Sequence, residues 1–180
     1  MELVLDYNVY LYEMYHLFEN WALDTDTNIS ISSFNSIIDY ILFKKKSLCT
    51  FTSCLGKWAS INYNGVIKPC NRYFPDDYSY GNIFDYNSFD EAFNSEGFRK
   101  IITKAIERRN KCKECEIFDY CSGGCNYIAL TENNGIENNN GNYCKYLKSM
   151  YRRIEYFLTA HKSDDRLNRF VKTKIKKSKI

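Results

Sequence analysis

Apolar side chains recur at spacings of three and four along the first part of the chain. This spacing predicts an amphipathic helix over residues 3–22. Its apolar stripe consists of Tyr7, Leu11, Met14, Phe18 and Trp21. Residues 29–32 alternate between isoleucine and serine, which predicts a short strand. The helical spacing then returns, so we expect a second helix over residues 34–42, ending near the lysines 44–46.

A β-hairpin is predicted over residues 58–70. Apolar and polar residues alternate on both sides of Asn64-Gly65, a pair that suits the left-handed backbone angles of a tight turn. Pro69 should end the second strand, because proline cannot donate to a strand ladder.

The region after the hairpin is expected to be a loop over residues 71–87 and then a long helix over 88–109. Ser88 and Glu91 have the spacing of a capping box, and Gly97 is expected to divide the helix into two pieces. Arg108, Arg109 and Lys111 lie at the C-terminal end of this predicted helix, where positive charge interacts favourably with the helix dipole.

The remaining chain begins with the cysteine-rich residues 110–126. Residues 131–142 are nearly all Asn, Glu and Gly, which predicts an exposed loop. A last helix over 143–160 has an apolar face formed by Leu147, Met150, Tyr151, Ile154, Phe157 and Leu158. After His161, which should cap that helix, we expect a loose polar tail.

Composition narrows the class of protein. Hydrophobic residues make up 44% and aromatic residues 17%, so the chain can build a core. The net charge of +3 is small, and much of it lies at residues 172, 174, 176, 177 and 179, which favours a solvated tail over a nucleic-acid or membrane surface. Because no secretory signal or membrane-spanning stretch is visible, we expect a cytoplasmic protein with reduced thiols.

The cysteines carry the strongest chemical signal. They occupy positions 49, 54, 70, 112, 115, 121, 125 and 144. Eight thiols in a reduced compartment indicate metal binding rather than disulfides, and they divide evenly into two four-coordinate sites. Four thiolates suit either a [4Fe–4S] cluster or a structural zinc ion. Gly123-Gly124, between two of the cysteines, would let the backbone bend closely around a bulky cluster.

The cysteine order, Cys-x4-Cys-x15-Cys, then Cys-x2-Cys-x5-Cys-x3-Cys and a final Cys, resembles the SPASM domain of radical SAM enzymes. That family includes anaerobic sulfatase-maturating enzymes and peptide maturases. The resemblance covers about residues 46–150, including Asn64-Gly65, the segment 81–83 and the run 121–125.

The resemblance implies an α+β domain in which a short β-hairpin and cluster-binding loops pack between helices. Residues 1–45 are similar to the last helices of a radical SAM barrel. They would form a barrel remnant, residues 46–150 the auxiliary-cluster domain, and residues 151–180 the helix end and basic tail.

The resemblance also implies two [4Fe–4S] clusters with crossed ligand sets. The first would be held by Cys49, Cys54, Cys70 and Cys125. The second would be held by Cys112, Cys115, Cys121 and Cys144. Fully ligated clusters would serve electron transfer during oxidation of a peptide or protein substrate. The expected partners are a radical SAM barrel and an electron carrier such as a ferredoxin or flavodoxin, with neither nucleic acid nor membrane.

Two departures from the family pattern limit this picture. The motif Cys-x3-Cys-x2-Cys, which would hold the S-adenosylmethionine cluster, is absent, so the chain alone should not cleave S-adenosylmethionine. Asn71 stands where sulfatase-maturating members carry an aspartate, and a neutral amide cannot act as a carboxylate base. This favours a peptide maturase over sulfatase maturation.

Alternative readings remain for each candidate residue. The thiols could hold zinc in a non-enzymatic binding module, or the clusters could stabilise a module that binds a peptide or partner. His16 and His161 are solitary and are not expected to be ligands. The carboxylates of Asp76, Asp77 and Asp85 could serve acid–base chemistry, but a solvated loop is the simpler reading.

Overall fold

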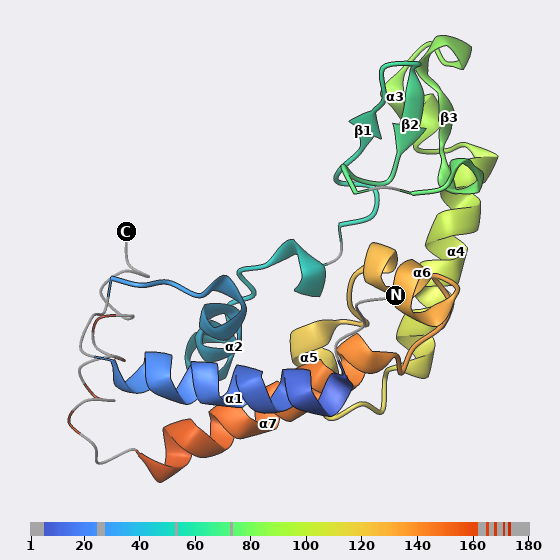
Figure 1. Ribbon diagram of the computed structural model, residues 1–180. Coiled ribbons are helices and arrows are strands. Elements are labelled where there is room, and N and C mark those ends of the chain that lie inside the picture. Colours follow the sequence, from blue (N-terminus) through green and yellow to red (C-terminus); the bar gives the residue numbers. More distant parts are fainter. Residues whose placement is uncertain are drawn as a thin grey trace. The chain divides into compact units, whose positions relative to one another are not determined.

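The computed structural model describes residues 6–24, 28–52, 54–72 and 74–161, together with residues 165, 168, 171 and 173 (Figure 1). The chain divides into two compact units. One contains residues up to Ser47 and those from Cys144 onward; the other contains Leu48–Tyr143. The first five residues and the five lysines of the basic tail lie outside the described residues, and so do the predictions made for them.

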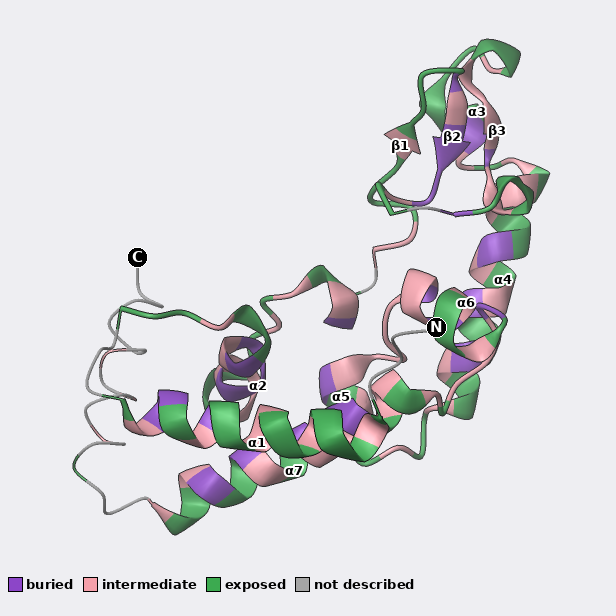
Figure 2. Cartoon of the chain, in the orientation of Figure 1, coloured by how far each residue is buried: buried purple, intermediate pink, exposed green. Residues whose placement is uncertain are grey.

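In the described part of the first unit, three helices pack together. These are α1 (Tyr7–Leu23), α2 (Ser32–Phe43) and most of α7 (Asn142–Ala160). Phe18 of α1 packs edge-on against Phe34 of α2, with 5.4 Å between the ring centroids, and against Phe157 of α7, at 5.2 Å. Buried residues recur along α7 at the predicted three-and-four spacing, whereas those of α1 are confined to its C-terminal part, at Phe18, Trp21 and Ala22 (Figure 2).

The strand predicted over residues 29–32 is wrong. Ile31 is the N-cap of α2, and the Ile29 carbonyl accepts a hydrogen bond from Nε1 of Trp21 at 3.0 Å. Ser30 Oγ accepts a hydrogen bond from the Asn35 side chain at 2.7 Å. The backbone and side chains of this short segment therefore serve helix ends, and the described part of this unit offers no strand for pairing.

A three-stranded antiparallel sheet lies in the second unit, in the order β1-β2-β3. β1 (Ser60–Ile61) and β2 (Val66–Lys68) form the predicted hairpin, which ends before Pro69 as expected. The turn differs in detail, because only Gly65 of the Asn-Gly pair has a positive φ, of 82°. β3 (Gly81–Asn82) pairs with β2, so the predicted loop over 71–87 supplies a third strand.

The long helix predicted over 88–109 is divided into α3 (Phe89–Ala92) and α4 (Glu96–Lys111). The break precedes Gly97 rather than falling on it, because the Ser95 hydroxyl caps α4 by accepting from the Phe98 N–H. Gly97 is needed for another reason: a Cβ there would lie 2.2 Å from the Ser79 carbonyl oxygen.

Short helices connect these elements. They are the 3₁₀ turns η1 (Cys49–Phe51), η2 (Asp76–Tyr78) and η3 (Ile83–Asp85), with the helices α5 (Phe118–Cys121) and α6 (Asn126–Asn133). The prediction of an exposed loop over 131–142 is wrong in two respects. α6 extends to Asn133, and the Ile136 side chain is fully buried in the core of this unit. That core also contains Ile67, Phe74, Tyr80, Ala92, Ile101 and Ala105.

Among the residues that the structure describes, none of the helices combines the length and apolar character needed to cross a bilayer.

Candidate metal centre

Four of the cysteines lie on separate elements of the second unit. Cys49 opens η1, Cys54 follows it, and Cys70 comes two residues after the end of β2. Cys125 is the N-cap of α6. Cys49 is exposed and the other three are half-buried. Ser60 of β1 fixes the hairpin end of the site, because its hydroxyl donates to the Cys70 carbonyl at 2.6 Å.

Electrostatics indicate that these four thiols occupy one region. Burial raises the pKa of the Cys54 thiol, and negative charge on three other thiols raises it further. Those three are Cys125, Cys49 and Cys70. Burial likewise raises the pKa of Cys70, and charges on Cys125 and Cys49 add to the rise. Cys54 therefore lies within electrostatic reach of the other three thiols.

The chemistry around this group fits an iron–sulfur cluster. All its donors are thiols, and the Arg72 backbone N–H lies 3.4 Å from Cys70 Sγ, where it lowers the thiol pKa. The buried hydroxyl of Tyr80 has no hydrogen-bond partner among the described residues, and the thiolate charges of Cys54 and Cys70 influence it. Backbone N–H groups and hydroxyls directed at sulfur are the usual outer environment of such clusters.

The remaining cysteines of the second unit lie in one compact stretch after α4. Cys112 caps α4, and its carbonyl accepts from the Cys115 N–H at 2.9 Å. Cys121 ends α5, and its carbonyl accepts from the Gly124 N–H at 2.9 Å. Asn139 Nδ2 lies 3.4 Å from Cys112 Sγ and provides a further donor to sulfur.

Cys144, the eighth cysteine, lies in the first turn of α7 and belongs to the first unit. It is half-buried. Its membership of a ligand set with Cys112, Cys115 and Cys121 therefore stays a prediction.

The loop from Cys121 to Cys125 has unusual backbone angles. Ser122, Gly123 and Gly124 have φ values of 53°, 84° and 74°, so three consecutive residues adopt the left-handed region. Glycine tolerates this region because it lacks a Cβ. A Cβ at Gly123 would also lie 2.9 Å from Cγ of Arg109. The predicted role of these glycines in a tight bend is thus consistent with the structure.

Arg108 supports this loop from inside the unit. Its side chain is 2% exposed, although it carries a charge. Nε donates to the Gly123 carbonyl at 2.8 Å, and Nη2 donates to the Gly124 carbonyl at 3.1 Å and to Asn126 Oδ1 at 2.6 Å. Nη1 donates to the Ile136 carbonyl.

The charge of Arg108 lies within electrostatic reach of three cysteines. Burial lowers its pKa, while negative charge on Cys112, Cys125 and Cys121 opposes that decrease. Arginine remains charged in proteins. Sequence reasoning treated Arg108 only as a favourable cation at a helix end. The missed signal is its spacing, because it continues the buried stripe of Ile101 and Ala105 along α4.

The described residues contain no group of three His, Cys, Asp or Glu side chains placed to hold one metal ion. A tetrahedral zinc ion would require sulfurs about 2.3 Å from a common centre. The thiols of the first group therefore share a region without closing on a point.

The other candidate residues lie apart from the thiols or in solvated turns. Asp76 forms an ion pair with the buried Lys68 at 2.7 Å, which holds η2 against β2. Asp77 and Asp85 lie in the 3₁₀ turns η2 and η3. His16 and His161 belong to the first unit, where the His161 ring stacks on Phe157. The His161 backbone N–H donates to the Phe157 carbonyl at 3.1 Å, as expected of a helix cap.

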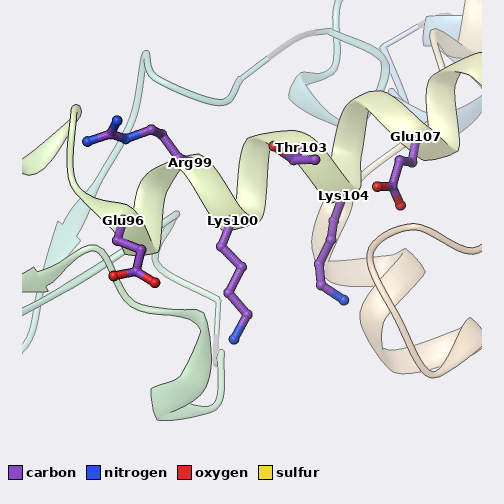
Figure 3. A pocket seen from close by; sticks show the side chains of 6 residues that line it. All are labelled: Glu96, Arg99, Lys100, Thr103, Lys104 and Glu107. Atoms are coloured by element: carbon purple, nitrogen blue, oxygen red, sulfur yellow. The ribbon is translucent and has the colours of Figure 1, made fainter.

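The outer face of α4 is charged and contains none of the thiols. Figure 3 shows the side chains of Glu96, Arg99, Lys100, Thr103, Lys104 and Glu107 along it. Both signs of charge occur on this face, with three cations between two carboxylates, which is typical of a solvated helix surface.

Residues 49–116 match the model of the SPASM family, described as an iron–sulfur cluster-binding domain. The chain is 28% identical over 139 residues to the cysteine-type anaerobic sulfatase-maturating enzyme of Clostridium perfringens (strain 13 / Type A), covering 76% of this chain and 37% of that protein. The corresponding enzyme of Clostridium novyi (strain NT) is 27% identical over 149 residues, covering 82% and 39%. The chain thus spans less than half the length of these relatives.

Solved structures share the fold. Hexahistidine-tagged anSMEcpe with bound AdoMet superimposes with a TM-score of 0.70 at 23% identity, covering 96% of this chain and 46% of that one. Native anSMEcpe with bound AdoMet and the Kp18Cys peptide gives a TM-score of 0.68 at 24% identity, covering 89% and 44%. The resemblance to the SPASM domain and the mixed helix-and-sheet fold predicted from the sequence are therefore confirmed.

Proposed function

We propose, from the cluster-binding family that residues 49–116 match, that this chain binds two [4Fe–4S] clusters. The first would be held by Cys49, Cys54, Cys70 and Cys125. The second would be held by Cys112, Cys115, Cys121 and Cys144. The observation that carries the proposal is the mutual influence of the first four thiols, which come from three distant parts of the sequence.

The clusters would supply one-electron transfer during oxidation of a peptide or protein substrate. The chain's own residues then have defined tasks. Its loops orient eight thiols, the Arg72 backbone N–H stabilises negative charge on Cys70, and Arg108 places a positive charge near thiols of both sets. Catalysis would require a radical SAM barrel, in the same parent protein or in a separate subunit.

The proposal also covers the substrate, the cellular location and the electron carrier. Named relatives are sulfatase-maturating enzymes, and a solved relative is complexed with a peptide, which supports a peptide or protein substrate for this chain. Asn71, in place of the family's aspartate, favours peptide maturation over sulfatase maturation. We further propose that the protein is located in the cytoplasm. Its electron carrier would be a ferredoxin or a flavodoxin.

Metal analysis of the purified chain tests cluster binding. After anaerobic reconstitution with iron and sulfide, two four-iron clusters require about eight iron atoms and eight acid-labile sulfides per chain. Stoichiometric zinc with little iron would overturn the proposal and favour a zinc-stabilised binding module.

Mixing the chain with a separately expressed radical SAM barrel tests its part in catalysis. We expect S-adenosylmethionine-dependent peptide modification only when both are present, and we expect the Cys70→Ala chain to fail. Equal modification with the Cys70→Ala chain would exclude an electron-transfer role for the first cluster and leave a passive binding module.

A further inference from the structure

Tyr80 is held rigidly in the core of the second unit. Its backbone N–H donates to the Ile67 carbonyl at 2.8 Å, and its own carbonyl accepts from the Tyr86 hydroxyl at 2.6 Å. The ring packs edge-on against Phe98, with 5.2 Å between the centroids, and the residue is 1% exposed. The hydroxyl therefore has a fixed position.

That hydroxyl is buried and has no hydrogen-bond partner among the described residues. Buried tyrosine hydroxyls usually find a partner, because an unpaired buried donor is destabilising. Phenylalanine would fill the same space without this cost. The hydroxyl of Tyr80 is thus destabilising unless a partner arrives that the polypeptide does not supply.

One of the candidate ligand cysteines borders the core that contains Tyr80. Cys70 packs against the same core as Tyr80. Burial raises the pKa of Tyr80, and thiolate charge on Cys54 and Cys70 raises it further. Because even an unperturbed phenol has a pKa of about 10, the Tyr80 hydroxyl keeps its proton at neutral pH and can donate a hydrogen bond.

We propose that the Tyr80 hydroxyl donates a hydrogen bond to a sulfur at the site of Cys49, Cys54, Cys70 and Cys125, and raises the reduction potential of the cluster bound there. This inference rests on the proposed function. A hydrogen bond to sulfur favours the more negative, reduced cluster, and such bonds help to set cluster potentials. Tyr80 would therefore act by setting the reduction potential of the cluster, and it is not a catalytic residue.

Substitution of Tyr80 by phenylalanine tests the inference, because it removes only the oxygen. In the reconstituted full chain we expect Tyr80→Phe to move the potential of one cluster to more negative values. A tenfold change in the ratio of reduced to oxidised cluster corresponds to about 59 mV for one electron, and we expect a shift of roughly that size or smaller. An exchangeable proton coupled to that cluster, visible by magnetic resonance in deuterated against ordinary water, should disappear.

Tyr86→Phe is the matched control. It removes a phenol hydroxyl from the same core, but one that already donates to the Tyr80 carbonyl. We expect it to lower stability and to shift the potential less than Tyr80→Phe does, and the exchangeable proton should remain because the Tyr80 hydroxyl is still present.

Each outcome has a separate meaning. Bound clusters whose potentials and exchangeable protons are the same in Tyr80→Phe and wild type would overturn the inference and leave the proposed function intact. Failure of the wild-type chain to take up iron would instead overturn the proposed function, and the inference with it.

Discussion

At the residue scale, Arg108 is the buried charge that most needs an explanation. Its hydrogen-bond acceptors are backbone carbonyls and the side-chain amide of Asn126, none of which carries a negative charge. Burying an unpaired charge is costly. The groups near it that can supply negative charge are cysteines, including Cys112 and Cys125. Arg108 therefore joins the two expected ligand sets electrostatically while it holds the loop between them.

Replacing Arg108 with glutamine should destabilise the protein strongly. The change leaves the carbonyls of Gly123, Gly124 and Ile136 without their donors, and each unsatisfied buried group costs about 1–3 kcal/mol. We expect a loss of about 3 kcal/mol or more in the free energy of unfolding, measured by urea denaturation of the reconstituted chain. Arg109→Gln, on the next residue, is the control and should cost much less. If both variants lost the same free energy of unfolding, the hydrogen bonds of Arg108 would have no special role in stability.

At the element scale, an ion pair fastens α4 to the segment that follows α6. Lys104 Nζ lies 2.9 Å from Glu137 Oε1, and both side chains are only partly buried. Hydrogen bonds from its own backbone N–H and from Lys104 lower the pKa of Glu137, and the bond to Glu137 raises the pKa of Lys104. This pair helps to hold Ile136 in the core.

The ion pair gives a pH dependence of known sign. Because the folded pKa of Glu137 lies below its unfolded value of 4.5, its stabilisation is complete above that value and is lost as pH falls through the folded pKa. We expect Glu137→Gln to cost about 0.5–1 kcal/mol at about pH 7 and much less at about pH 3, measured by urea denaturation. Glu132→Gln, at the exposed end of α6, is the control. It reports how low pH destabilises the protein for reasons other than the ion pair, including loss of iron in acid. A deficit that stays constant across this range would contradict the assignment.

The elements that sequence reasoning predicted are those with a long or chemically marked pattern. α7 repeats its apolar spacing along its length, and the hairpin is marked by Gly65 and Pro69. β3 has two residues, and its position depends on pairing with β2, which no local pattern encodes. The segment around Ile136 looked exposed because one apolar residue among polar ones gives no period. That residue is nevertheless buried by contacts from distant parts of the chain.

At the scale of the whole molecule, the cysteine spacing identified the candidate site, but spacing alone could not assign its ligands. Cys121 and Cys125 are close in sequence, yet the resemblance places them in different sets. Charge on Cys125 raises the pKa of Cys54 and Cys70, which come from distant segments, and the ligand sets themselves stay a prediction. Tyr80 and Arg108 could not be assigned roles from sequence, because their meaning depends on burial beside thiols that arrive from elsewhere.

The most direct test of the crossed ligand sets compares Cys121→Ala with Cys125→Ala by electron paramagnetic resonance of the reconstituted, reduced chains. The account predicts that Cys125→Ala perturbs the same cluster signal as Cys70→Ala. It predicts that Cys121→Ala perturbs the other signal, which Cys112→Ala also alters. If Cys121→Ala and Cys125→Ala perturb one and the same signal, the two sets are not crossed and the account is wrong.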